Sequence, residues 1–383
     1  MPIFDQGYQH WAGTLSGHAW RWLTITRHGV RVGMKGVFLR ILVIASWLPA
    51  VGLAFMLCLW GLLEQKSALV APLMTFLSGI FPPDILADPK QYRVAVWTIC
   101  FRNFLEIGLP LSMLVVLLVG PGLISQDLRF NALPLYFSRP LRRIDYFVGK
   151  LGVIAWFLAL VVILPSLLAY ALGLLFSLDV TILWDTLPLL AACLAYGAVV
   201  VVSSGTLMLA LSSLSRNSRY VALFWVALWF VSGIVASILT GIEGDQRRSR
   251  LYRQQQAARQ ALPLAGKPRN PEKALAEQRV AQEAARKAMD EFKEGERRAA
   301  QGNWRPMVSY TGNLSRVGQR LLDVDAAWVK VSQFQPPEAR EQFLLNTLGP
   351  QYPWYWSAGL LAALFGLSAC TLNVRVRSLD RLR

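Results

Sequence analysis

Six apolar stretches divide this chain of 383 residues, and each is long enough to cross a lipid bilayer as a helix. A spanning helix needs about 20 apolar residues, which few soluble core helices contain. Hydrophobic residues make up 54% of the chain and charged residues only 16%, which excludes a soluble globular protein. The predicted fold class is an all-α polytopic membrane protein with six transmembrane helices, near residues 38–63, 103–125, 148–176, 184–212, 219–242 and 352–374.

Basic residues gather in alternate connections between these stretches. Lys and Arg are frequent before the first stretch, between the second and third, between the fourth and fifth, and after the sixth. The turn between the third and fourth stretches holds Asp179 and Asp185 but no cation. Because cytoplasmic loops retain Lys and Arg, we expect a multi-pass protein of the cell (inner or plasma) membrane with both termini in the cytoplasm. The net charge of +16 is then a topology signal and an attraction to anionic membrane lipid, and we expect no nucleic-acid binding.

The amino-terminal arm, residues 1–37, mixes Trp with Arg, a composition typical of a membrane interface. We expect a cytoplasmic interfacial helix, amphipathic and bent near Gly29 and Gly33, with a disordered tail as the alternative. Residues 64–102 are interpreted as an outer loop, because Pro82, Pro83 and Pro89 interrupt a stretch that is too short to span.

The long insertion 243–351 changes composition abruptly and is predicted to be an extracytoplasmic helical domain. Segments 246–262 and 272–300 are rich in strong helix formers, and the Pro-rich run between them cannot continue a helix, which indicates a helical hairpin. The hairpin has an Ala/Phe seam that either packs within the chain or docks an extracytoplasmic protein at 246–300. The remaining predicted parts are transmembrane helices 1–5 (38–242, with a cytoplasmic coupling segment at 126–147), transmembrane helix 6 (352–374) and a cytoplasmic tail (375–383).

No catalytic or metal-binding spacing is visible in the sequence. His10, His18 and His28 are too far apart for a compact ligand set, and none of the four cysteines has CxxC spacing. No GxSxG or HExxH motif occurs. We therefore expect no catalytic residues and no metal site, which disfavours an intramembrane enzyme.

The most specific stretch is residues 120–150, GPGLISQDLRFNALPLYFSRPLRRIDYFVGK. Ser138 can cap the following helix, and Pro140 suits its first turn, where the missing N–H costs nothing. Leu133, Leu135, Tyr136 and Phe137 are expected to be exposed on the cytoplasmic face unless something covers them. An exposed apolar patch ringed by Arg predicts a protein partner.

This stretch resembles the permease subunits of type-2 ABC exporters. In that family an acidic residue after the second span precedes a Leu-rich turn, Ser-Arg-Pro or a close variant, an Arg, an aromatic residue and Gly-Lys. The matching positions are Asp127, Leu133, Ser138-Arg139-Pro140, Arg143, Tyr146 and Gly149-Lys150. The six-span layout, the interfacial arm and an outer insertion between spans 5 and 6 also match. Asp127 departs from the commoner Glu, and segment 243–351 is far longer than the re-entrant helices usual there.

The resemblance implies a permease subunit that pairs with a second permease subunit, as a homo- or heterodimer, and with a separate ABC ATPase subunit. ATP and Mg would bind the ATPase, with no cofactor in this chain, which has no GxxxxGK[ST] phosphate loop and is not expected to be an enzyme. The implied ATPase-coupling residues are Asp127, Arg129, Leu133, Leu135, Tyr136, Ser138, Arg139, Pro140, Arg142, Arg143, Tyr146 and Lys150, with Arg216 and Arg219 in a second, smaller contact.

Arg102 and Glu106 lie four residues apart at the predicted outer end of span 2 and can pair on one helix face. Ionisable groups at membrane depth are costly and often functional, so both a transport pathway and a structural ion pair stay open. The spans carry few charges, so the expected cargo is amphiphilic or lipid-linked, and the resemblance implies that it is exported. The alternative hypothesis is a mechanotransmitting scaffold, whose outer helical domain acts on an extracytoplasmic partner without transport.

Overall fold

The computed structural model describes residues 20–66, 88–137, 141–177, 179, 181–261, 301–333 and 351–377, and single positions at 72, 79, 287, 294–295, 298, 336, 339–340, 343–344 and 347–348. This described part is helical and contains no strands. Six of its helical segments are long and apolar enough to cross a membrane, which confirms the predicted spans and indicates a multi-pass membrane protein. They are Val37–Glu64, Pro89–Arg129, Arg143–Ser177, Thr181–Leu214, Ser218–Gln246 and Trp354–Arg375.

Most spans are built from more than one helix. The first joins α2 (Val37–Ala45) to α3 (Leu48–Glu64), and the second joins α6 (Pro89–Val119) to α7 (Gly122–Arg129). The fourth and sixth are the single helices α11 (Thr181–Leu214) and α18 (Trp354–Arg377). The third and fifth each contain a π-helical turn, and their parts are α9 (Arg143–Leu158), η3 (Ala159–Ile163) and α10 (Leu164–Ser177), then α12 (Ser218–Val226), η4 (Ala227–Val231) and α13 (Ser232–Ala261).

The π-helical turn η3 has a local cause. Pro165 is the second residue after it and lacks the N–H that would bond to the carbonyl of Val161, which lies within η3. A π turn widens the helix at this point and absorbs the irregularity. The third span therefore continues as one helix across the proline.

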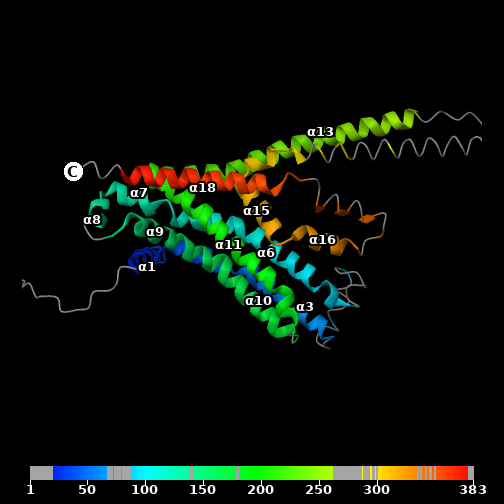
Figure 1. The fold of residues 1–383 in the computed structure, drawn as a ribbon, viewed down its shortest axis with the longest axis horizontal. Helices are drawn as coiled ribbons and strands as arrows, with labels where there is room; N and C mark the ends of the chain where they lie inside the picture. The colour runs from blue at the N-terminus through cyan, green and yellow to red at the C-terminus, as the bar shows by residue number, and fades with distance from the viewer. Residues whose placement is uncertain are drawn as a thin grey trace, which may run out of the picture.

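The helices pack as a bundle with α11 among its central members. α11 contacts α18, α9, α7 and α6, while α3 packs along α10 (Figure 1). Large side chains fill the interior, and Trp97, Phe101, Met113 and Trp225 are fully buried. Trp225 donates its indole N–H to the carbonyl of Met113 at 3.0 Å, so the polar edge of this ring is satisfied inside the apolar core.

Helix α1 (Arg21–Gly33) lies against α9. Thr26 donates to the carbonyl of Gly149 at 2.9 Å, and the missing side chain of Gly149 lets the backbone of α1 approach closely. A helix in the amino-terminal arm is therefore present, although residues 1–19 lie outside the described part. α1 continues as a helix through Gly29 and ends at Gly33, one of the two positions where a bend is predicted.

The second span begins earlier than predicted. α6 starts at Pro89, so residues 89–102 belong to a helix and not to the outer loop expected at 64–102. The charges of Lys90 and Arg93 hide this start from a hydropathy argument. Most of 67–87 lies outside the described residues.

The segment after span 5 has two kinds of structure. α13 runs without a break through the predicted domain boundary at 242/243, and Figure 1 shows it extending past the rest of the bundle. Farther along, η5 (Arg305–Val308), α15 (Tyr310–Leu321) and α16 (Val324–Ser332) pack against the span helices. Tyr310 and Leu314 are buried there, so part of 243–351 belongs to the bundle. The predicted turn and second arm of the hairpin, 263–300, fall almost entirely outside the described residues.

Candidate functional site

One end of the bundle gathers the segments that the sequence singles out. Figure 1 shows α1, α7, the short helix α8 (Leu133–Phe137) and the start of α9 together at this end, close to the last turns of α18. α7 continues span 2 beyond a break at Gly120-Pro121, and α8 follows it. The connection from span 2 to span 3 is thus folded into short helices that lie on the ends of the spans.

A cluster around Asp127 ties this connection to span 3. Tyr146 donates its hydroxyl to Oδ2 of Asp127 at 2.7 Å, and Nζ of Lys150 lies 2.6 Å from the same oxygen. The Lys150 ammonium also lies 5.7 Å from the ring centre of Tyr136 and 5.4 Å from that of Tyr146, within reach of cation–π attraction. Burial, and then the charge of Asp127, raise the pKa of Tyr136, which keeps its hydroxyl protonated. The structure therefore brings these four predicted site residues together.

The predicted exposed patch at α8 is wrong for the side chains that can be described. Leu133 is 2% exposed and Tyr136 is half-buried. The cause is a chain reversal at Asn131, whose φ of 51° is left-handed and whose successor Ala132 donates to the carbonyl of Asp127 at 2.9 Å. This reversal turns α8 inward. The side chains of Leu135 and Phe137, and all of Ser138, Arg139 and Pro140, lie outside the described residues.

Other described residues of the connection are exposed. Phe130 is 73% and Ile144 is 65% exposed, and Arg129 and Arg142 are exposed beside them in sequence. The guanidinium of Arg129 lies 5.5 Å from the ring centre of Phe130. Among the side chains that the structure describes on this connection, the large exposed apolar ones, Phe130 and Ile144, flank α8.

The helix of the third span, α9, begins at Arg143, later than the helix start predicted from Ser138 and Pro140. Asp145 caps it by accepting the backbone N–H of Arg142 at 3.2 Å, and its charge also favours a helix N-terminus. Arg143 itself is half-buried. The helix start is therefore set by an acidic cap that the sequence argument overlooked.

Serine hydroxyls fasten α7 to the end of α11 and the start of α12. Oγ of Ser212 accepts the backbone N–H groups of Ile124 at 3.1 Å and Ser125 at 3.0 Å, and it donates to the carbonyl of Pro121 at 2.8 Å. The hydroxyls of Ser125 and Ser218 lie 2.9 Å apart. This link was missed, although the run SSLSRNS at 212–218 gave a signal for capping and turn chemistry.

The turn between spans 4 and 5 carries the two remaining predicted contacts. Arg216 and Arg219 are both exposed, and Asn217 caps α12 by accepting the N–H of Arg219 at 3.0 Å. Arg219 shares a cavity of about 510 Å³ with the Asp127 cluster; its lining includes His28, Gln126, Asp127, Tyr136, Lys150 and Arg219. The two segments predicted to contact an ATPase therefore meet at one end of the molecule.

A second charged cluster, unnoticed in the sequence, lies at the other end of the spans. Arg93 of α6 is 2% exposed, and its Nη2 atom lies 2.6 Å from Oε2 of Glu64 and 3.0 Å from Oδ2 of Asp179. Its Nη1 atom lies 3.3 Å from Oδ2 of Asp185. Arg93 supplies the cation that the turn between spans 3 and 4 lacks, and it joins α3, α6 and α11. The sequence signal that could have revealed this cluster is an arginine placed directly before an apolar helical run.

Arg102 and Glu106 do form an ion pair, with 2.8 Å between Nη2 and Oε1. Because α6 begins at Pro89, the pair lies near the middle of this helix and not at its end as predicted. Gln319 of α15 donates to the same carboxylate oxygen at 3.5 Å, and a cavity of only about 10 Å³ remains beside the pair. This packing favours a structural ion pair over a pathway in the conformation described.

No family model matches the chain, and no curated protein matches it. What the protein does must therefore be inferred from its own residues and their geometry. Within the described residues, no group of three or more His, Cys, Asp or Glu side chains is placed to hold a metal ion.

Proposed function

We propose that this chain is the membrane-spanning permease subunit of an ABC transporter in the cell membrane. It would pair with a second permease subunit and with ATPase subunits, and couple their ATP hydrolysis to export of an amphiphilic or lipid-linked substrate. The alternation of basic connections supports a cytoplasmic location for both termini and for the end with α7 and α8. The sequence resemblance in residues 120–150 supports the class.

The observation that carries the proposal is the attachment of the connection 126–147 to several spans at once. Span 2 continues into it through α7, span 3 is fixed to it by the contacts of Tyr146 and Lys150 with Asp127, and Ser212 of span 4 holds the start of α7. Packed elements of this kind move as units, because interiors are close-packed. A protein that pulled on α7 and α8 would therefore move the ends of three spans.

The docking edge is expected at the exposed arginines and the apolar residues next to them. Arg129, Phe130, Arg142 and Ile144 offer cations and apolar area on the same connection, a combination typical of protein interfaces. Arg216 and Arg219 extend the basic surface onto the neighbouring turn.

Co-purification tests this proposal. Tagged protein from its native membrane should retain an ATPase recognised by a GxxxxGK[ST] loop and by ATP hydrolysis. Reversing the charges at Arg139, Arg142 and Arg143 to Glu should release the ATPase. The matched control reverses Arg250, Arg253 and Lys287, which are exposed and lie far along the insertion, and should retain it. Full ATPase retention by the first variant would contradict the coupling role.

A mechanotransmitting scaffold is the second candidate, and α13 is the observation that favours it. This 30-residue helix forms the second half of span 5 and continues beyond it from 247 to 261, and Arg305 braces it through an ion pair with Glu243 at 2.9 Å. An outward helix joined rigidly to a span can pass movement to an extracytoplasmic protein at 246–300. Deleting 247–300 discriminates the two: an exporter should still move its substrate, whereas a scaffold should lose its partner and its function.

A further inference from the structure

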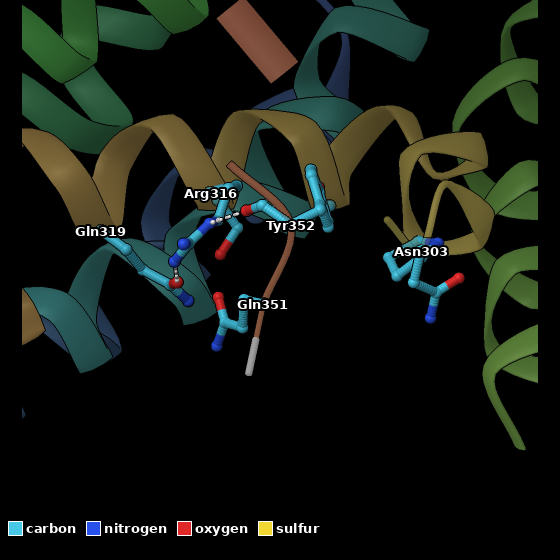
Figure 2. Close-up of a pocket in the computed structure, with 8 residues that line it drawn as sticks. Asn303, Arg316, Gln319, Gln351 and Tyr352 are labelled. Carbon is cyan, nitrogen blue, oxygen red and sulfur yellow. Dashed lines mark hydrogen bonds between the residues drawn. The ribbon is translucent and has the colours of Figure 1, made fainter. Parts of the chain in front are cut away.

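A polar cavity lies between α15 and the segment that leads into α18. Its volume is about 300 Å³, at the lower end of ligand pockets and suited to a small polar group. Figure 2 shows Arg316 and Gln319 of α15 beside Gln351 and Tyr352, with Asn303 farther along the same cavity. Ser315 also lines it.

Arg316 is the cation of this cavity, and its contacts within the described residues are with neutral groups. Its Nε atom donates to the carbonyl of Tyr352 at 3.3 Å, and Nη1 donates to Oε1 of Gln319 at 3.4 Å. The side chain is half-buried. Within the described residues, the ion pairs of the neighbouring arginines Arg102 and Arg320 engage Glu106 and Asp323, and no carboxylate pairs with Arg316. Arg93 and Arg102 are each satisfied by carboxylates. A partly buried charge without a counter-ion is unfavourable, so a bound anion would stabilise Arg316.

The carboxylate that Gln319 contacts, Glu106, is already engaged. Oε1 of Glu106 forms an ion pair with Nη2 of Arg102 at 2.8 Å and accepts a hydrogen bond from the amide nitrogen of Gln319 at 3.5 Å. Gln319 thus turns its amide nitrogen toward Glu106 and its oxygen toward Arg316, and it separates the two charges. Asn303 is likewise occupied, since its amide nitrogen donates to Glu243. Arg316, Ser315 and Gln351 are donors that line the cavity.

The aromatic residues at the start of α18 indicate the level of the cavity in the membrane. Tyr352 lines it, and Trp354, Tyr355 and Trp356 follow directly at the first turn of the span. Trp and Tyr gather where a span meets the headgroup region. The cavity therefore lies where lipid headgroups lie. A phosphate offers oxygens to all three donors, whereas Arg316 alone can satisfy both oxygens of a carboxylate.

We propose that this cavity binds the phosphate headgroup of an anionic amphiphile, with Arg316 as the counter-ion and Ser315 and Gln351 as further donors. The site goes beyond the proposed function, because binding of a headgroup here requires neither an ATPase nor transport. A lipid phosphate and free inorganic phosphate share the required chemistry, so the test must separate them.

Binding of short-chain phosphatidylglycerol to the purified full-length protein in a neutral detergent tests the site, with short-chain phosphatidylcholine and inorganic phosphate as parallel ligands. Thermal unfolding and the Kd are measured for each. We expect R316Q to weaken phosphatidylglycerol binding at least about tenfold, as expected for loss of a charge-assisted pair. R320Q, one turn along the same helix and paired with Asp323 at 3.7 Å, should leave the Kd within about twofold.

A second variant guards against misfolding of R316Q. Gln351 is exposed and precedes α18, so Q351E keeps the shape of the side chain and leaves Arg316 in place. Its carboxylate would supply an internal counter-ion, and we expect it to weaken phosphatidylglycerol binding as well. If the wild type binds inorganic phosphate as well as the lipid, and both R316Q and Q351E lose this binding, the anion site is supported. Its ligand would then be a free anion and not a lipid headgroup. Equal binding of phosphatidylglycerol by the wild type, R316Q and Q351E would overturn the proposal.

Discussion

The Nζ atom of Lys150 lies 2.6 Å from Oδ2 of Asp127, which joins the second turn of α9 to α7 across the connection between spans 2 and 3. Both side chains are largely buried, with 10% and 14% exposed. Such a pair depends on both partners, because either charge alone would be left in a low-dielectric site.

Replacing Lys150 by Met should therefore lower the free energy of unfolding by about 3 kcal/mol, since Asp127 keeps its charge and loses its counter-ion. The double variant D127N/K150M should recover most of this loss. Thermal or denaturant unfolding in a fixed detergent measures both. Lys90→Met is the matched control, because Lys90 pairs with Asp179 at 3.2 Å but is 60% exposed, and its loss should cost at most about 1 kcal/mol. Equal losses in the two single variants would contradict the buried role of Lys150.

Gly149→Ala should loosen α1 from α9. A Cβ atom at this position would lie 2.8 Å from Cβ of Ile25 and 2.9 Å from the carbonyl oxygen of Trp22, and backbone cannot move aside cheaply. We expect a destabilisation of about 1–3 kcal/mol and faster proteolysis between α1 and α2. Gly52→Ala is the control, since nothing lies within 4 Å of its added Cβ, and it should be neutral or slightly stabilising. Unchanged protease resistance in G149A would show that α1 does not depend on this close approach.

Glu64→Gln should destabilise the far end of the bundle. The Glu64 side chain is 1% exposed and forms an ion pair with Arg93. It also accepts a hydrogen bond from the indole N–H of Trp60 at 2.8 Å. Loss of its charge leaves Arg93 with more distant or exposed acids, at an expected cost of about 3 kcal/mol in unfolding free energy. Asp323→Asn, in an exposed pair at 3.7 Å, should change stability little. Replacing both Arg93 and Glu64 by Met separates two explanations. If the double variant is nearly as stable as the wild type, only an unpaired charge is destabilising; if it stays destabilised, the ion pair itself stabilises the fold.

Acid should weaken the contact between Asp179 and Arg93. The hydrogen bond from Arg93, followed by those from Thr181 and Lys90, lowers the pKa of Asp179 from its ordinary value of 3.8. A carboxyl group with a depressed pKa contributes stability above its unfolded pKa and loses it as the pH falls toward the folded pKa. The wild type should exceed D179N in stability by a constant amount from pH 5 to 7, and this excess should shrink below about pH 4. An excess that is unchanged at pH 3 would contradict the assignment.

Sequence patterns could predict the spans because a bilayer demands long apolar helices, and all six appear where the hydropathy places them. The start of span 2 could not be predicted, because Arg93 is tolerated there through acids from elsewhere in the chain, Glu64 of α3 and Asp179 of the turn between spans 3 and 4. Of the site, the i,i+4 spacing of Tyr146 and Lys150 was readable, whereas their meeting with Asp127 depends on tertiary structure. The burial of Leu133 follows from one left-handed residue, Asn131, which no periodicity reveals.

α13 has one mechanical consequence. Its 30 residues form an unbroken rod of about 45 Å that starts directly after the π-helical turn η4. A tilt of about 10° at that turn would sweep the distal end through about 8 Å. A small rearrangement within the membrane-spanning bundle would thus become a larger displacement at the far end of α13.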